Sequence, residues 1–264
     1  MVALLNTLML ALAAPLANQG VATNISNLSF RISASLGGGV PLRIMPLGAS
    51  ITYGTRSSDG NGYRAALRTQ LVAEPGTNKV NMVGSRQAGT MRDSDVEGWP
   101  GYRIEQVHAK AMAAASVRKW KPNVVLINAG TNDATQGWNV STAGVRMEAM
   151  IRDVWSVSPR AVVVLSTLLV NKNAATEKNV GVINRQFGEV ARKLRDVEGR
   201  RVVLVDMHGE AGPGTGDMAD DTHPNDVGYR KMANVWFQGL VAASDAGWLQ
   251  APEPVQGVPD DGAA

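Results

Sequence analysis

The chain has 264 residues, of which 44% are hydrophobic and 19% are charged, and its formal net charge is +3. These values are typical of one or two globular domains with a sizeable core, and they exclude a disordered or collagen-like chain. The sequence contains no cysteine, which excludes disulfides, thiolate metal sites and a cysteine nucleophile. Only three histidines are present, so a multi-histidine metal centre is not expected. No dense Lys/Arg patch favours a nucleic-acid partner.

Residues 1–17 (MVALLNTLMLALAAPLA) are apolar, end in small residues and are too short for a membrane span. This pattern predicts a secretory signal peptide, with a buried N-terminal helix as the alternative. Three Asn-x-Ser sequons fit a secreted glycoprotein, and they lie at Asn24, Asn27 and Asn139.

Composition divides the rest of the chain into three parts. Residues 18–39 are polar and Gly-rich, which predicts a linker or arm. Residues 251–264 (APEPVQGVPDDGAA) have the Pro, Gly and Asp content of a disordered tail. Residues 40–250 are therefore expected to form one domain.

This domain alternates two kinds of segment. Five continuous apolar runs are rich in Val, Ile and Leu, and they are Leu42–Leu47, Val80–Val83, Val124–Ala129, Ala161–Ser166 and Val202–Asp206. Runs that do not alternate with polar residues are typical of strands buried on both faces. Between them apolar residues recur at steps of three and four, as at Val180, Ile183 and Phe187, which indicates helices. The pattern predicts a three-layer α/β/α sandwich with a five-stranded parallel sheet.

In such folds the functional groups lie on loops at the carboxyl ends of the strands. Ser50 follows the first run between small residues, where its side chain can be exposed. Gly101 precedes an amphipathic helix, and its missing Cβ lets a backbone N–H approach a ligand. Asn132 follows the third run and offers a neutral donor for a developing oxyanion.

Asp220 stands three residues before His223, on a loop that follows the fifth run. This spacing allows an acid to hold the imidazole Nδ1 while Nε2 faces a serine. Asp221 is the alternative acid. Together with Ser50, these residues form a candidate set for nucleophilic catalysis.

The other two histidines are rivals for the same role. His208 follows a strand and has Asp206 two residues before it. Residues two apart on a strand share a face, which is an awkward geometry for a carboxylate to hold the ring. His108 lies within a helical pattern and is expected on the surface of a helix or partly buried.

Four stretches carry a resemblance to a known family: RIMPLGASITYG, EGWPGYRIEQ, VVLINAGTND and DDTHPNDVGYRKMA. The chain resembles the SGNH (GDSL-type) hydrolase superfamily and, within it, carbohydrate esterase family 3, whose known members include acetylxylan esterases. The resemblance extends from Arg43 to Leu240 and implies the flavodoxin-like SGNH fold. One departure is Ala49, which stands where the usual GDS motif has an acid. That acid is not a catalytic residue, so the departure bears only on the support of the serine loop.

The resemblance also implies roles for the candidate residues. Ser50 would be the nucleophile, His223 the general base and Asp220 the acid that orients it. The backbone N–H groups of Ser50 and Gly101 and the amide of Asn132 would form the oxyanion hole. Gly98, in the same loop as Gly101, is the alternative glycine. No metal or organic cofactor is expected.

Three aromatic residues on or beside these loops, Trp99, Tyr102 and Trp138, are candidates for stacking on sugar rings, with packing within the loops as the alternative. The predicted function is a secreted, extracellular serine esterase that removes acetyl groups from plant cell-wall polysaccharide, with acetylxylan as the expected substrate. We expect a monomer with no nucleic-acid or membrane partner. One alternative is a lipase or lysophospholipase-type SGNH esterase that acts on lipid or small acyl esters. Another is a carbohydrate-binding protein that uses the same scaffold without activity.

Overall fold

The computed structural model describes residues 35–76 and 79–262. The predicted signal peptide, residues 18–34 of the predicted arm, and the sequons at Asn24 and Asn27 lie outside these described residues. The strands are β1 (Leu42–Gly48), β2 (Val80–Met82), β3 (Arg86–Gln87), β4 (Asp95–Gly98), β5 (Val124–Asn128), β6 (Val162–Ser166) and β7 (Val202–Val205). The α-helices are α1 (Ser50–Tyr53), α2 (Arg64–Ala73), α3 (Ile104–Ala111), α4 (Val117–Trp120), α5 (Thr131–Gln136), α6 (Ala143–Val157), α7 (Ala174–Arg192) and α8 (Asp226–Asp245).

Short 3₁₀ turns are η2 (Leu36–Gly39), η3 (Val140–Thr142) and η5 (Thr215–Asp217), and the π-helical turn η4 (Lys193–Val197) extends α7. None of the described helices combines the length and apolar character needed to cross a membrane.

All five predicted strands form, and they are parallel, with β1 between β2 and β5 and with β6 and β7 beyond. Two strands were not predicted. Strand β4 pairs in parallel with the carboxyl end of β1, and β3 pairs antiparallel with β4, so the described sheet has seven strands. Residues Asp95–Gly98 lack the Val/Ile run that marks the other strands, which is why their pattern indicates a loop.

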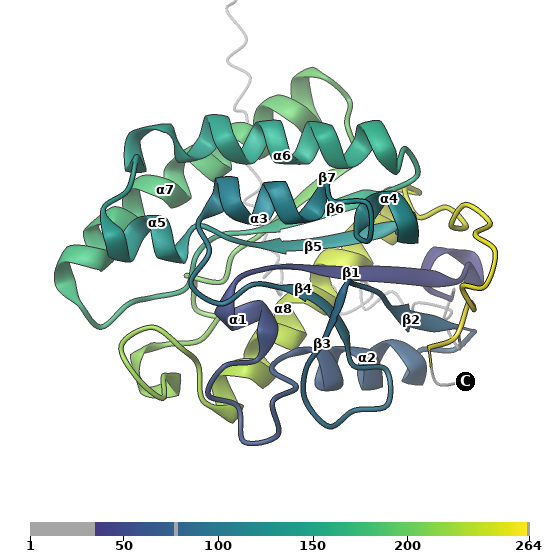
Figure 1. Ribbon diagram of the computed structural model, residues 1–264, viewed down its shortest axis with the longest axis horizontal. Helices are drawn as coiled ribbons and strands as arrows, with labels where there is room; N and C mark the ends of the chain where they lie inside the picture. The colour runs from purple at the N-terminus through teal and green to yellow at the C-terminus, as the bar shows by residue number, and fades with distance from the viewer. Residues whose placement is uncertain (1–34, 77–78, 263–264) are drawn as a thin grey trace, which may run out of the picture. The chain divides into compact units, whose positions relative to one another are not determined.

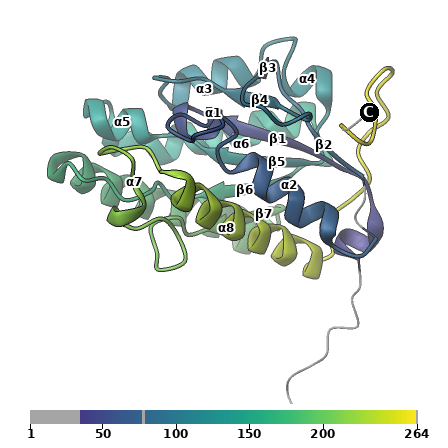
Figure 2. The same ribbon diagram turned by 90° about the horizontal axis from the view of Figure 1, so that it is seen from below.

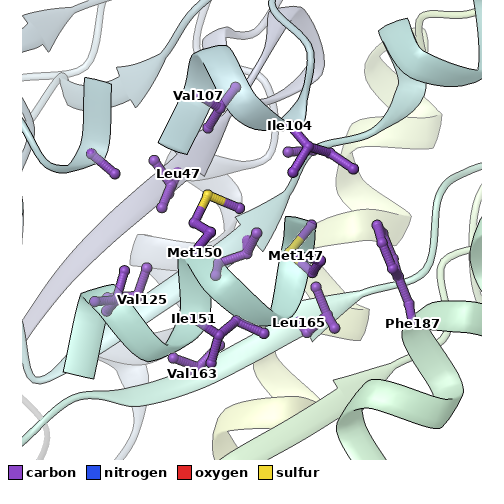
Figure 3. Close-up of a cluster of buried hydrophobic side chains, with 14 of the residues drawn as sticks. Leu47, Ile104, Val107, Val125, Met147, Met150, Ile151, Val163, Leu165 and Phe187 are labelled. Carbon is purple, nitrogen blue, oxygen red and sulfur yellow. The ribbon is translucent and has the colours of Figure 1, made fainter. Parts of the chain in front are cut away.

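Helices cover both faces of the sheet and confirm the α/β/α class (Figure 1). On one face, α3, α6 and α7 bury side chains such as Ile104, Ile151 and Phe187 against the strands (Figure 3). On the other face α2 and α8 lie side by side (Figure 2) and bury Leu67 and Trp236. The sheet is thus buried on both faces, as its unbroken apolar runs require.

The carboxyl end of β1 lies unusually close to its neighbours. Gly48, the last residue of β1, is opposite Asn128 of β5, and a Cβ at Gly48 would overlap the Asn128 carbonyl oxygen and the Thr52 hydroxyl. On the other side Gly98 of β4 pairs with Gly48, and a Cβ there would lie 2.8 Å from the Tyr53 nitrogen. Two glycines therefore allow the segment that leaves β1 to pass between β4 and β5.

The chain on either side of the domain is also attached to it. Leu36 of the predicted arm is buried, and the Gly37 N–H donates to the Ser244 hydroxyl at 2.8 Å. Residues 251–262 lie along the amino ends of β1 and β2 and do not form the disordered tail that their composition indicates. The buried Arg43 guanidinium donates to the Glu253 carbonyl (2.9 Å), and Arg68 pairs with Asp261 (2.9 Å). Composition missed this because the partners are backbone carbonyls and side chains far away in the sequence.

We expect Gly48→Ala to lower the free energy of unfolding by about 3 kcal/mol, because the added Cβ meets a backbone carbonyl that cannot move without breaking the β1–β5 pairing. The matched control is Gly188→Ala, in the middle of α7, where a Cβ has nothing within 4 Å. This control should raise stability by about 0.5–1 kcal/mol through helix propensity. Urea unfolding followed by circular dichroism measures both changes, and equal effects of the two substitutions would contradict the close approach at Gly48.

Candidate active site

Ser50 is the first residue of α1, two residues after β1 ends. Its backbone N–H lies in the first turn of that helix, where an N–H has no partner within the helix. The turn closes at once, because Gly54 adopts φ +95° and its N–H donates to the Ser50 carbonyl at 3.1 Å. This tight strand-to-helix turn leaves the Ser50 side chain partly exposed at the carboxyl edge of the sheet.

The structure brings Ser50, His223 and Asp220 together. The Nε2 atom of His223 lies 2.9 Å from the Ser50 hydroxyl. On its other side, Nδ1 lies 2.9 Å from Oδ2 and 3.1 Å from Oδ1 of Asp220. The three side chains therefore form one hydrogen-bonded chain between residues that are 173 positions apart in the sequence. It is the arrangement of a serine activated by a histidine that an acid orients.

The Asp220–His223 loop has its own supports. The Ala219 N–H donates to the His223 carbonyl at 2.8 Å and closes the loop on itself. Directly after the loop, the Asn225 side chain accepts from the N–H groups of Val227 and Gly228, which caps the start of α8. The histidine is thus held between a closed turn and a capped helix.

The carboxylate of Asp220 is stabilised in its charged form. Partial burial opposes ionisation, but Oδ1 accepts backbone N–H groups from His223 (2.7 Å) and Thr222 (2.8 Å), and the imidazole adds a further hydrogen bond. Together these hydrogen bonds hold the pKa of Asp220 well below its usual range. The acid is therefore an anion, able to orient the imidazole, at any ordinary pH.

The rival histidines have other partners. The Nε2 atom of His208 lies 2.6 Å from the Glu177 carboxylate on α7, and Asp206 accepts the His208 backbone N–H instead of its ring. The Nε2 atom of His108 lies 2.9 Å from Asp153. Neither ring is hydrogen-bonded to Ser50, whose hydroxyl lies against His223. The exposed Asp221 contributes its backbone carbonyl to the Lys172 N–H.

The two candidate glycines differ clearly in their surroundings. Gly98 is buried and packs against Tyr53, and its carbonyl oxygen accepts a hydrogen bond from the Arg86 guanidinium at 2.7 Å. Gly101 is exposed in a turn closed by the Tyr102 N–H and the Trp99 carbonyl, with φ +82° and nothing within 4 Å of a Cβ position. Gly101 is therefore the glycine whose backbone is accessible to a ligand.

Asn132 lies in the first turn of α5, and its Nδ2 donates to the Tyr102 carbonyl at 2.8 Å. This contact joins the Asn132 helix to the loop that carries Gly101. An amide nitrogen has two N–H groups, so the contact still leaves one for a ligand.

A buried carboxylate that the sequence did not single out connects the same two segments and also pairs with α6. Asp133 is fully buried, its Oδ2 accepts the Ile104 N–H at 3.0 Å, and its Oδ1 is hydrogen-bonded to Arg146 of α6. Burial raises the pKa of Asp133, while Arg146 and the Ile104 N–H oppose the rise. Asp133 stands in the GTND motif, but nothing in the sequence identifies Arg146 as its partner.

The three aromatic candidates are not equivalent. Trp99 and Tyr102 stack on each other, with ring centroids 5.6 Å apart. The Trp99 ring also carries Arg86 at 4.7 Å and Lys110 at 4.3 Å, and its indole N–H donates to the buried Glu97 carboxylate at 2.7 Å. These contacts favour a packing role for Trp99.

Trp138 is 45% exposed, with the Arg103 guanidinium 4.4 Å from its ring centroid. Of the three, it presents the most open surface.

The described residues contain no group of three or more His, Asp or Glu side chains placed to hold a metal ion.

Comparisons with known proteins agree with this architecture. The GDSL-like lipase/acylhydrolase family model matches residues 47–231. A multidomain esterase from Ruminococcus flavefaciens is 27% identical over 269 aligned residues, covering 90% of this chain and 34% of that protein. The chain therefore spans about a third of the length of this relative.

Several solved structures have the same fold. A family 3 carbohydrate esterase from Clostridium thermocellum matches with a TM-score of 0.64 and 23% identity, over 78% of this chain and 98% of that one. A family 3 carbohydrate esterase from Talaromyces cellulolyticus gives a TM-score of 0.66 and 21% identity, over 78% and 99%. A lipase/acylhydrolase from Enterococcus faecalis gives 0.60 and 20%, over 81% and 100%.

We expect Asp133→Asn to lower the free energy of unfolding by about 3 kcal/mol, because it removes the fully buried anion that pairs with Arg146 and leaves the guanidinium only its ion pair with the more exposed Glu105. Arg146→Gln should cost a similar amount, and the double variant should cost less than the sum of the two. A double-mutant cycle by urea unfolding measures this coupling. Additive effects would show that the two side chains do not act as a pair.

Proposed function

The chain belongs to the GDSL-like lipase/acylhydrolase family, and from this premise we propose a function. It is an SGNH esterase related to carbohydrate esterase family 3. It is secreted, and it uses a serine nucleophile to remove acetyl groups from plant cell-wall polysaccharide, with acetylxylan as substrate. The observation that carries the proposed mechanism is the hydrogen-bonded chain from Ser50 through His223 to Asp220.

In this mechanism His223 Nε2 takes the Ser50 proton as Oγ attacks the ester carbonyl. The tetrahedral oxyanion receives hydrogen bonds from the Ser50 and Gly101 N–H groups and the Asn132 amide. Loss of one such donor typically lowers the rate by about 10²–10³. As the C–O bond breaks, His223 gives its proton to the leaving sugar hydroxyl. Water then attacks the acyl-enzyme while His223 takes one of its protons. As the bond between the acyl carbon and Ser50 Oγ breaks, acetate is released and His223 gives that proton to Ser50.

The carbohydrate substrate is supported by the kind of proteins that the chain resembles and by its surface. Two of the matched structures are family 3 carbohydrate esterases. The exposed indole of Trp138 offers a flat apolar face of the kind that stacks on sugar rings. The apolar residues 1–17 support secretion, and the exposed Asn139 offers a site for a glycan.

The roles of the three histidines predict distinct kinetics. We expect Ser50→Ala and His223→Ala to lower kcat on p-nitrophenyl acetate by about 10⁴-fold or more, because each removes a member of the nucleophile–base pair. His208→Gln is the matched control and should stay within about threefold of wild type, since its ring bonds Glu177. If His208→Gln abolished turnover and His223→Ala did not, the assignment of the base would be wrong.

A substrate panel tests the specificity. Acetate release from acetylated xylan should exceed hydrolysis of long-chain acyl esters by about 10²-fold or more in kcat/KM, because remote sugar contacts lower the barrier only for the polysaccharide. The panel pairs acetylated xylan with p-nitrophenyl acetate, butyrate and octanoate and with a lysophospholipid. Preference for octanoate or the lysophospholipid would establish the lipase-type alternative. Tight xylan binding without acetate release would establish the non-catalytic alternative.

A further inference from the structure

The segment that follows the serine helix is fixed to the helix that follows the histidine. The hydroxyl of Tyr229 donates to the Thr55 carbonyl at 2.6 Å, and the Ser58 N–H donates to the Asp226 carboxylate at 2.9 Å. Burial raises the pKa of Tyr229 above its usual range, so this hydroxyl remains a donor. Tyr229 and Asp226 lie in the first turns of α8, directly after the His223 loop. Residues Thr55–Ser58 are thus attached on both sides of Arg56.

The backbone of Arg56 adopts a conformation that is unfavourable for a residue with a Cβ. Its φ of +73° lies in the left-handed region. The surrounding turn holds it there, because the Ser57 hydroxyl donates to the Gly54 carbonyl at 2.8 Å and accepts the Gly62 N–H at 3.0 Å. Such strain persists only where neighbouring contacts fix it, and it is often found at functional sites.

This turn directs the Arg56 side chain onto the acid of the candidate triad. Its Nε donates to Oδ2 of Asp220 at 3.0 Å. That same oxygen accepts from His223 Nδ1 at 2.9 Å, while Oδ1 accepts the backbone N–H groups of Thr222 and His223. The guanidinium and the imidazole therefore share one carboxylate oxygen.

Other charged groups around the loop are engaged elsewhere. Lys172 donates to the Met218 carbonyl at 3.1 Å, Lys231 pairs with Asp217 at 2.6 Å, and the Asp226 carboxylate accepts from Ser58. Asp221 is exposed next to Asp220. Among the described residues, Arg56 and His223 are the side chains that pair with the Asp220 carboxylate.

We propose that Arg56 is a positioning residue of the active site: it holds the Asp220 carboxylate through the oxygen that His223 shares, and its charge opposes a second positive charge on the imidazole. This inference deepens the proposed function and rests on its assignment of the triad. A positive charge close to an imidazole opposes the addition of a second one, and sharing Oδ2 weakens the hydrogen bond that would stabilise the imidazolium. Because Arg56 is 62% exposed on its side chain, the effect should be moderate and sensitive to salt.

The scarcity of histidine makes a direct test possible. With three histidines in the sequence, a proton NMR titration resolves each ring, and His223→Gln identifies the signal of His223. In Arg56→Gln, which removes the charge, the titration midpoint of His223 should rise by about half a pH unit at low salt, as expected for one charge several ångströms away in a water-like dielectric. Arg56→Lys keeps the charge, so the titration midpoint of His223 should stay within about 0.1 pH unit of its wild-type value.

Arg118→Gln is the matched control, because it removes an exposed arginine from α4, which leads into the amino end of β5. It should move none of the three midpoints. In the pH profile of kcat/KM on p-nitrophenyl acetate, the acid limb of Arg56→Gln should move to higher pH by the same amount. In about 0.5 M salt, where screening is strong, both shifts should shrink.

The proposal would be overturned if Arg56→Gln left the His223 midpoint unchanged, or if Arg56→Lys moved it as far as Arg56→Gln does. An equal loss of rate at every pH with no shift of the acid limb would also overturn it, because that is the result of a purely structural contact. The NMR readout does not require turnover. A shifted midpoint in a protein that hydrolyses no ester would therefore contradict the proposed function and leave the placement of Arg56 intact.

Discussion

The close approach of three strand ends is the constraint on which the rest of the site depends. Gly48 lets β1 pass against the carbonyl of Asn128, and Gly98 lets the turn after β1 pack against β4. With side chains at either position, the turn that carries Ser50 could not leave the sheet between its two neighbours. Because all three strands point the same way, their ends deliver the serine, the Gly101 loop and Asn132 to one edge. Backbone packing of the sheet thus sets the geometry of the candidate active site.

Most of the sheet and the pairing of Asp220 with His223 could be predicted, because they depend on local sequence patterns. Unbroken Val/Ile runs identify strands buried on both faces, and the spacing of Asp220 and His223 is short enough for one loop to bring them together. Strand β4 could not be predicted, because its four residues gain their β conformation from pairing with β1. Local propensity is a weak guide where tertiary pairing decides.

The supporting residues could not be predicted for a related reason. Asp133 and Arg146 come from different helices, and Arg56 reaches Asp220 across 164 positions of sequence. The sequence shows which residues can react, but the contacts that orient them are made between segments whose distance in the chain carries no pattern. The same applies to Trp99, whose cation–π contacts with Arg86 and Lys110 depend on the β3–β4 pairing and on α3.

The contacts of residues 250–262 affect the order in which the sheet gains its hydrogen-bond partners during synthesis. Central strand β1 is made early, yet its buried Arg43 donates to the Glu253 carbonyl, and Asn123, which accepts the Arg43 N–H, also donates to the Gln250 carbonyl. These acceptors are translated after every candidate catalytic residue. A nascent chain that already contains Ser50, Asp220 and His223 therefore still lacks one of the two carbonyls that accept from Arg43 and one of the two that accept from Asn123; the others, on Trp120 and Pro41, are already present. The first long strand of the sheet gains its last hydrogen-bond partners only when translation of this segment is complete.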